Sequence, residues 1–197
     1  NFFRSVFFFP YVASLVAICV CWNFLLMKTG PVNQILNAIG FHMDKSWTSS
    51  RQLAVWAIII VSVWRNARYY MVMYLAALQG VPGELYEAAT VDGANGWQKF
   101  RKVTLPMLTP TTFFVSIMLV ITCFKVYDVV AIMTQGGPGR ATKMLVTYIF
   151  ELSFGSETVA TSAQYGVASA VSMVLLAIVL LVTFVQFRAE KKWVNYT

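Results

Sequence analysis

The feature that most constrains this chain is a run of 23 residues, Tyr165 to Phe187, that contains no charged side chain. A helix needs about 20 apolar residues to cross the hydrocarbon core of a bilayer. A second uncharged run of the same length extends from Ser5 to Met27. The whole chain is 58% hydrophobic and 12% charged, whereas a soluble domain usually carries about 25% charged residues. The sequence therefore predicts a membrane protein.

Two further runs are apolar apart from one pair of charged residues each. Leu53 to Gln79 contains Arg65 and Arg68, and Met107 to Met133 contains Lys125 and Asp128. We therefore expect an all-α polytopic membrane protein in which residues 1–197 form one domain. Its four predicted spans are residues 5–27, 53–79, 107–133 and 165–187.

The segments between these spans differ in composition. Residues 28–52 are rich in turn-forming residues and are expected to be mostly loop. Residues 80–106 are polar and have helical spacing. Residues 134–164 open with four residues that include three glycines, Gly136 to Gly139, and continue with an apolar run from Met144 to Phe154. That run is short for a span and predicts an interfacial or re-entrant helix in an external loop.

Lysine and arginine flank the spans with a small bias. One side carries Arg4, Lys99, Arg101, Lys102, Arg188, Lys191 and Lys192, and the other carries Lys28, Lys45, Arg51, Arg140 and Lys143. Because basic residues are enriched in cytoplasmic loops, we expect the loop 80–106 and both termini in the cytoplasm. We attribute the net charge of +7 to this bias. Nucleic-acid binding is not expected, because the sequence has no module that mixes aromatic and basic residues.

The polar loop reads PGELYEAATVDGANGWQKFRKVTLP over residues 82–106. Pro82 suits the first turn of a helix, and Glu84 and Glu87 near that end complement the helix dipole. Asp92 and Gly93 should end this helix, because glycine tolerates the left-handed conformation that follows many helices.

A second short helix is expected after this turn. Either Asp92 or Asn95 is suited to cap it. Trp97, Phe100 and Val103 then recur at helical spacing on one face. A helical hairpin with an aromatic face fits a role in docking to another protein, although an ordinary surface loop between two spans has the same pattern.

The spacing of this loop resembles the EAA motif of ABC-importer permeases: E-A-A, three residues, G, nine residues, I, one residue, L-P. Glu87, Ala88 and Ala89 match the start, and Gly93 follows at the required step. Val103 stands at the isoleucine position, and Leu105 and Pro106 complete the motif.

This resemblance implies the transmembrane fold of type I importers (MetI-like) and a coupling helix that enters a groove of a separate ATPase. The implied coupling residues are Glu87, Ala88, Ala89, Asp92, Gly93, Leu105 and Pro106. Glu87 would make a polar contact with the ATPase, and Gly93 would form the turn.

Three other segments resemble sugar permeases of the maltose and glycerol-3-phosphate type: Phe2 to Tyr11, Thr134 to Pro138 and Lys192 to Tyr196. Members of this family usually have six spans, so the resemblance implies that about four of six are visible and that an N-terminal part is missing. It also implies import of a sugar or related solute into a bacterial cell. The implied partners are a second permease subunit, two ATP-binding subunits and an extracytoplasmic solute-binding protein.

Charged residues at bilayer depth usually face a cavity or a partner. Arg65, Arg68 and Asp128 are therefore candidates for the translocation path, with Arg68 contacting hydroxyl or anionic groups of the solute. Tyr69 is a further candidate, because its ring is suited to stacking on a sugar ring. The alternative is that the arginines pair with acids of a partner subunit or reach toward the interface. Lys125 and Asp128 are three residues apart and are expected to form a local ion pair.

Other functional classes have less support. An ion-coupled secondary transporter needs midplane acids, of which the spans offer Asp128. A permease for a non-sugar solute remains an alternative within the same class. The glycine-rich stretch lacks the phosphate-binding pattern G-x-x-x-x-G-K-[ST], and the one histidine cannot complete an H-E-x-x-H zinc site. We therefore expect no metal, no cofactor and no enzymatic activity in this chain, with ATP and magnesium bound by the partner ATPase.

Overall fold

The structure is a computed structural model that describes residues 14–42, 44–155 and 163–193, and every regular element among these residues is helical. The predicted all-α fold class is confirmed. The segment Phe2 to Tyr11 and the start of the predicted span 5–27 lie outside the described residues. The chain divides into two compact units, one made of Asn1–Arg68 and Phe124–Leu176, the other of Tyr69–Cys123 and Ala177–Thr197.

The first unit has a core of small and branched side chains. It is built from α2 (Leu15–Leu25), the first part of α4 (Leu53–Gln79) and the short helix α9 (Asp128–Met133). Its buried members are Cys19, Leu26, Ala57, Ile58, Val61, Val129, Val130 and Met133. The alanine and valine side chains are short, so the backbones of these helices can approach closely.

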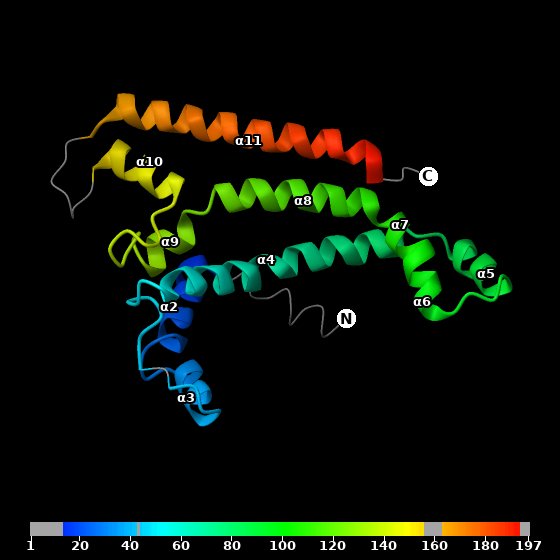
Figure 1. Cartoon of the computed structure of the whole chain (residues 1–197), viewed down its shortest axis with the longest axis horizontal. Coiled ribbons are helices and arrows are strands. Elements are labelled where there is room, and N and C mark those ends of the chain that lie inside the picture. The colour runs from blue at the N-terminus through cyan, green and yellow to red at the C-terminus, as the bar shows by residue number, and fades with distance from the viewer. Residues whose placement is uncertain (1–13, 43, 156–162, 194–197) are drawn as a thin grey trace. The chain divides into compact units, whose positions relative to one another are not determined.

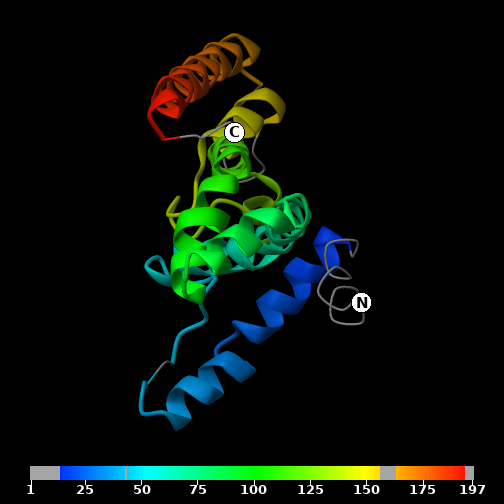
Figure 2. The ribbon, with the colours of Figure 1, turned by 90° about the vertical axis from the view of Figure 1, so that its right-hand side faces the viewer.

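The predicted loop 28–52 contains one helix, α3 (Pro31–Ala38), which begins with a proline in its first turn. Figure 2 shows α2 and α3 joined by a tight turn. The turn is held by Asn33, which is fully buried. The Asn33 amide nitrogen donates to the carbonyl oxygens of Met27, Lys28 and Lys45 at 3.1, 3.2 and 3.0 Å. Its amide oxygen accepts from the indole of Trp47 at 2.8 Å.

Helix α4 has the bounds of the predicted span 53–79, whereas the predicted span 107–133 is divided. Three residues, 125–127, separate the end of helix α8 (Thr109–Phe124) from the start of α9 at Asp128. Lys125 therefore lies just beyond a helix C-terminus and Asp128 lies in a first turn, where each charge complements a helix dipole. The predicted ion pair between them is wrong: in the described part of the chain Lys143 pairs with Glu151, whereas Lys125 and Asp128 do not pair with each other.

Two helical segments in the described part of the chain are long and apolar enough to cross a membrane by length and composition. They are Thr109–Met133, which includes the break before α9, and Tyr165–Glu190. The second segment belongs to α11 (Tyr165–Trp193). Membrane crossing by α2 and α4 stays a prediction.

The glycine-rich loop after α9 is held by two threonines, of which Thr142 is buried. Thr142 is fully buried, contacts the Thr134 hydroxyl at 2.8 Å and donates to the Gly137 carbonyl at 2.7 Å. Gln135 and Arg140 have positive φ values of 49° and 69°. Helix α10 (Leu145–Phe154) follows at the position of the predicted short helix.

In the second unit, α8 and the C-terminal part of α11 lie side by side (Figure 1). The rings of Phe113 and Phe187 meet edge to face with centroids 5.4 Å apart. The Gln186 amide donates to the Ser116 carbonyl at 3.4 Å. Outside these contacts α11 presents many exposed apolar side chains, such as Leu181 and Phe184. Such a surface is expected where lipid or another subunit replaces water.

Candidate functional site: the hairpin 83–107

The EAA segment forms a helical hairpin that follows α4 in the second unit (Figure 1). Its first arm is α5 (Gly83–Val91), preceded by Pro82 and with Glu84 in its first turn. The predicted end of this helix is confirmed. Asp92 caps the C-terminus, and Gly93 follows with a φ of +73°. This is the left-handed region, which is open to glycine without steric cost.

The second arm begins with α6 (Gly96–Lys99), and Asn95 is its cap. The Asn95 side chain accepts from the backbone N–H of Gln98, and the Gln98 side chain accepts from the backbone N–H of Asn95, both at 2.9 Å. This reciprocal pair satisfies two donors that a helix start otherwise leaves free. Of the two predicted caps, Asn95 is therefore the one the structure uses.

The arm continues through a π-helical turn, η1 (Phe100–Thr104), into the short helix α7 (Leu105–Met107). Such π-helical turns are rare. They occur mostly as single turns inserted in α-helices, and they often lie at functional positions. Pro106 lies in the first turn of α7, and its carbonyl accepts from the Thr109 hydroxyl at 2.7 Å. The proline thus joins the hairpin to α8.

Four polar side chains tie the two arms together. The Tyr86 hydroxyl of α5 is 2.8 Å from the Thr104 hydroxyl of η1. The Lys99 ammonium of α6 donates to the Thr90 hydroxyl of α5 at 2.8 Å, and Thr90 donates to the Tyr86 carbonyl at 2.6 Å. The two arms of the hairpin are therefore braced against each other by side-chain hydrogen bonds.

The hairpin exposes large apolar side chains to solvent. The exposed fractions are 89% for Val91, 69% for Trp97 and 43% for Phe100. The rings of Trp97 and Phe100 stack with centroids 5.6 Å apart. No residue of α5 or α6 is buried. An aromatic pair exposed on a braced hairpin is suited to filling a pocket on another protein.

The structure places five of the predicted coupling residues on α5 and its turn, and the other two, Leu105 and Pro106, in α7 at the end of the second arm. Glu87 and Ala88 are exposed on α5, and Ala89 is half-buried. The carbonyls of Ala88 and Ala89 accept the turn hydrogen bonds from the backbone N–H groups of Asp92 and Ala94, at 3.0 and 2.9 Å. Leu105 is half exposed, at 50%.

Sequence reasoning missed the bracing residues Tyr86, Thr90 and Thr104. Thr104 is the variable residue between Val103 and Leu105 of the motif, and Tyr86 directly precedes its first residue, Glu87. In the sequence these residues are marked only by lying next to motif positions. The pairing of Tyr86 with Thr104 could not be predicted, because a contact across 18 residues leaves no periodic pattern.

The predicted path residues lie in different surroundings. The Arg68 guanidinium lies 3.3 Å above the centroid of the Trp64 ring, a cation–π contact. Trp64 in turn meets Trp22 of α2 edge to face, with centroids 5.4 Å apart. One terminal nitrogen of Arg68 is buried and has no hydrogen-bond partner among the described residues. A buried charged donor without a partner is costly, so a further polar group is expected to meet it.

The other candidates do not join this stack. Arg65 belongs to the same unit as Arg68, and neither forms an ion pair with Asp128 within the part of the chain described here. Asp128 is exposed at the start of α9. Tyr69 belongs to the second unit, where its ring meets Tyr70 edge to face at 5.4 Å.

Residues 1–194 match the protein family described as "binding-protein-dependent transport system inner membrane component". The chain is 35% identical over 192 residues to the probable ABC transporter permease protein YurN of Bacillus subtilis, with 96% of this chain and 64% of YurN covered. It is also 35% identical over 193 residues to the lactose transport system permease protein LacF of Rhizobium radiobacter, with 96% and 63% covered.

Among solved structures, the fold matches a bacterial alginate ABC transporter crystallised with an alginate-bound periplasmic protein. The TM-score is 0.80 at 24% identity, with 96% of this chain and 64% of that chain covered. This likeness supports the fold. The chain spans somewhat less than two thirds of the length of the relatives it matches.

Proposed function

Since this chain belongs to the family of binding-protein-dependent transport system inner membrane components, we propose that it is a permease subunit of an ATP-driven importer for a sugar or related solute. The observation that carries the proposal is the braced hairpin 83–107, which presents the EAA spacing on a left-handed turn with an exposed aromatic pair. The lactose permease among the relatives supports a sugar as the solute.

The remaining components of the importer belong to the same proposal. A second permease subunit completes the path, and two ATP-binding subunits bind ATP and magnesium and hydrolyse the nucleotide. An extracytoplasmic solute-binding protein delivers the solute, in keeping with the description of the family. The present chain transports and does not catalyse a reaction.

The hairpin couples ATP hydrolysis to transport. Trp97 and Phe100 enter a pocket of the ATPase, and Glu87 makes a polar contact at its edge. Because Tyr86 and Lys99 brace the two arms, a displacement of the ATPase moves the whole hairpin. Pro106 passes this displacement to α8 through α7. The spans then alternate between inward-open and outward-open states.

The orientation follows from the basic residues. The hairpin carries Lys99, Arg101 and Lys102, and the tail carries Arg188, Lys191 and Lys192. We place both on the cytoplasmic side of a bacterial membrane, where the ATPase resides. The segments 28–52 and 134–164 then face outward.

Arg68 lines the solute path in this proposal. Its stacking on Trp64 fixes the guanidinium plane, and its buried nitrogen is left to donate to a hydroxyl or an anionic group of the solute. A planar guanidinium held on an indole resembles the way proteins preorganise arginine for bidentate recognition. Arg65, Tyr69 and Asp128 stay predicted members of the path.

The test of the coupling role is co-purification of the assembled importer. Gly93→Ala forces a side chain into a φ of +73°, at a cost of about 1 kcal/mol. The free hairpin relieves this cost by relaxing its turn, and binding then has to restore the turn, so association with the ATPase should weaken by up to about fivefold. Glu87→Ala should weaken it through the loss of a polar contact. Association is measured by titrating the purified ATPase onto the permease pair in lipid nanodiscs.

The chain offers matched controls for both changes. Gly96 and Gly93 both have open space around an added Cβ, but Gly96 has no positive φ. Glu84 is, like Glu87, an exposed acid on α5. Gly96→Ala and Glu84→Ala should leave association unchanged. Equal affinities for Gly93→Ala and Gly96→Ala, or full transport by an importer that lacks the hairpin, contradict the proposal.

A further inference from the structure

Helix α3 has an apolar side that the described residues cover only in part. Val32 packs against the core of the first unit, and Leu36 is half-buried. Beside them lie Ile35 and Ile39, which are more than half exposed, as is Phe41 just beyond the helix. At 3.6 residues per turn, the opposite side of α3 is polar and carries Asn33, Gln34 and Asn37. The helix is therefore amphipathic, and part of its apolar side is left uncovered.

A second uncovered apolar stripe lies on the neighbouring helix α2. Val16, Val20 and Phe24 recur every four residues along α2, and all three are more than half exposed. Gly30 brings the start of α3 against the end of α2, since a Cβ at this position would lie only 2.7 Å from the Phe24 carbonyl oxygen. Residues 15–43 contain one charged side chain, that of Lys28. Both helices therefore expose apolar surface that carries almost no charge.

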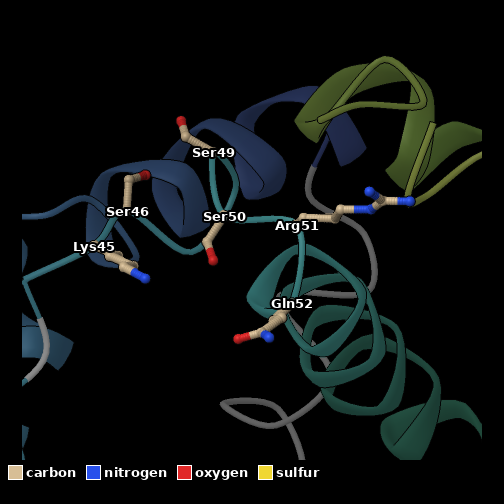
Figure 3. A pocket seen from close by; sticks show the side chains of 6 residues that line it. All are labelled: Lys45, Ser46, Ser49, Ser50, Arg51 and Gln52. Carbon is tan, nitrogen blue, oxygen red and sulfur yellow. The ribbon is translucent and has the colours of Figure 1, made fainter. Parts of the chain in front are cut away.

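Two lysines meet where this apolar surface ends. The Asn33 amide nitrogen donates to the carbonyl oxygens of Lys28 and Lys45 at 3.2 and 3.0 Å, so the two lysine backbones are neighbours although one precedes α3 and the other follows it. Both lysines are exposed, and within the described ranges neither forms an ion pair with Asp44, the acid next to Lys45. From Lys45 to Gln52 the chain lines a polar hollow of about 530 Å³ (Figure 3). The lysine pair thus marks the boundary between apolar and polar surface.

We propose that α3 lies in the lipid–water interface of the membrane, with Ile35, Ile39 and Phe41 among the acyl chains of phospholipids. Lys28 and Lys45 then bind headgroup phosphates. Amphipathic helices with basic residues beside an apolar face lie in the plane of a bilayer surface in this way. Membership of the family of inner membrane components places lipid beside the chain. The inference goes beyond the proposed function, and it depends neither on the solute nor on the coupling role of the hairpin.

A phospholipid offers the two chemistries of this surface in the order in which they occur. Its anionic phosphate lies next to its acyl chains, as the lysine pair lies next to the apolar side of α3. Lysines near an anionic bilayer surface contribute to binding, and apolar side chains contribute through the area they bury. Because Gly30 and Asn33 hold α3 against the end of α2, the interface then fixes the depth at which α2 enters the bilayer.

The experiment measures the depth of single nitroxide labels on α3. The full-length protein is assembled with its partner subunits in lipid nanodiscs that contain phosphatidylglycerol. Cys21→Ser and Cys123→Ser remove the exposed thiols, and Cys19 stays because it is buried. Relaxation of each label is measured with oxygen, which concentrates among acyl chains, and with a nickel chelate, which stays in water. The ratio of the two accessibilities reports depth.

Labels at Ile39→Cys and Phe41→Cys test the apolar side, and two sites keep the test decisive if one label disturbs assembly. The matched control is Gln34→Cys, at an exposed residue on the polar side of the same helix. The oxygen-to-nickel ratio should be higher at residues 39 and 41 than at residue 34 by roughly threefold or more.

The lysine pair is tested in the Ile39→Cys protein. Lys28→Gln combined with Lys45→Gln should lower the ratio at residue 39 roughly twofold, because the helix is held less firmly at the anionic surface. Arg51→Gln, which removes an exposed cation outside the pair, should leave the ratio unchanged. An unchanged ratio in the double lysine variant refutes headgroup binding.

Three results overturn the position of α3. Equal nickel accessibility at residues 34 and 39 means that water covers the apolar side. Low accessibility to both reagents at residues 39 and 41 means that another protein covers it. A high oxygen ratio at all three labels places α3 inside the acyl region and not at the interface. The proposed function is tested separately, by association of the hairpin with the ATPase, so either can fail alone.

Discussion

Asn33 is the residue whose replacement should most disturb the loop of residues 28–52. Its amide nitrogen contacts three carbonyl oxygens, but an amide nitrogen carries two hydrogens, so the three contacts share two donors. With the bond from Trp47, the side chain makes about three net hydrogen bonds, each contributing roughly 1 kcal/mol. Asn33→Ala should therefore lower the free energy of opening this loop by about 3 kcal/mol.

Amide hydrogen exchange measures this opening. The backbone N–H of Trp47 is the reporter, because it is bonded to the Leu26 carbonyl within the loop that Asn33 fixes. A loss of about 3 kcal/mol corresponds to an increase in exchange rate on the order of 100-fold when the loop closes faster than its open state exchanges. The experiment follows peptides that cover residues 44–52 in the purified complex by mass spectrometry.

The control lies one residue away. Gln34 is exposed, and its side chain makes one hydrogen bond to the Thr29 carbonyl at 3.0 Å. Gln34→Ala should raise the exchange rate of Trp47 less than about threefold. If the Asn33→Ala protein assembles normally and Trp47 exchanges as slowly as in the wild type, the loop is held by other contacts and the reasoning is refuted.

Two further predictions concern transport. Tyr86→Phe removes the contact with Thr104, worth about 1 kcal/mol. It should lower the number of solute molecules imported per ATP hydrolysed, while the ATPase still binds. An unchanged number of solute molecules per ATP in proteoliposomes contradicts the bracing role. Arg68→Ala removes a charged donor, a contribution of about 1.5–3 kcal/mol, and should lower the import rate roughly tenfold or more. Normal import with an unchanged range of solutes rules Arg68 out of the path.

The features predicted correctly depend on neighbours in the sequence. The end of α5, the left-handed Gly93 and the Asn95 cap each involve residues within three or four positions of one another. Capping and turn preferences act over this range, so they can be read without knowledge of tertiary contacts. The same locality explains why the short helix α10 lies where the apolar run predicted it.

The features that were missed depend on distant contacts. Asn33 lies in a segment predicted to be mostly loop, yet it binds Lys45 and Trp47, 12 and 14 residues away. The predicted pairing of Lys125 with Asp128 assumed one continuous helix, whereas the break at residues 125–127 gives each charge its own helix end. A spacing of three residues indicates a pair only if the helix persists, and that depends on packing.

Because of the π-helical turn η1, the spacing of the EAA motif determines a rotation about the helix axis as well as a distance along it. An α-helix advances about 100° around its axis per residue, and a π-turn takes up one residue more than an α-turn. The stretch from Gly93 to Val103 includes most of this turn. Its fixed residue count therefore sets an angle as well as a length. Without the extra residue, α7 would be rotated by about 100° relative to Trp97. The motif thus fixes the direction in which α8 leaves the hairpin relative to Trp97.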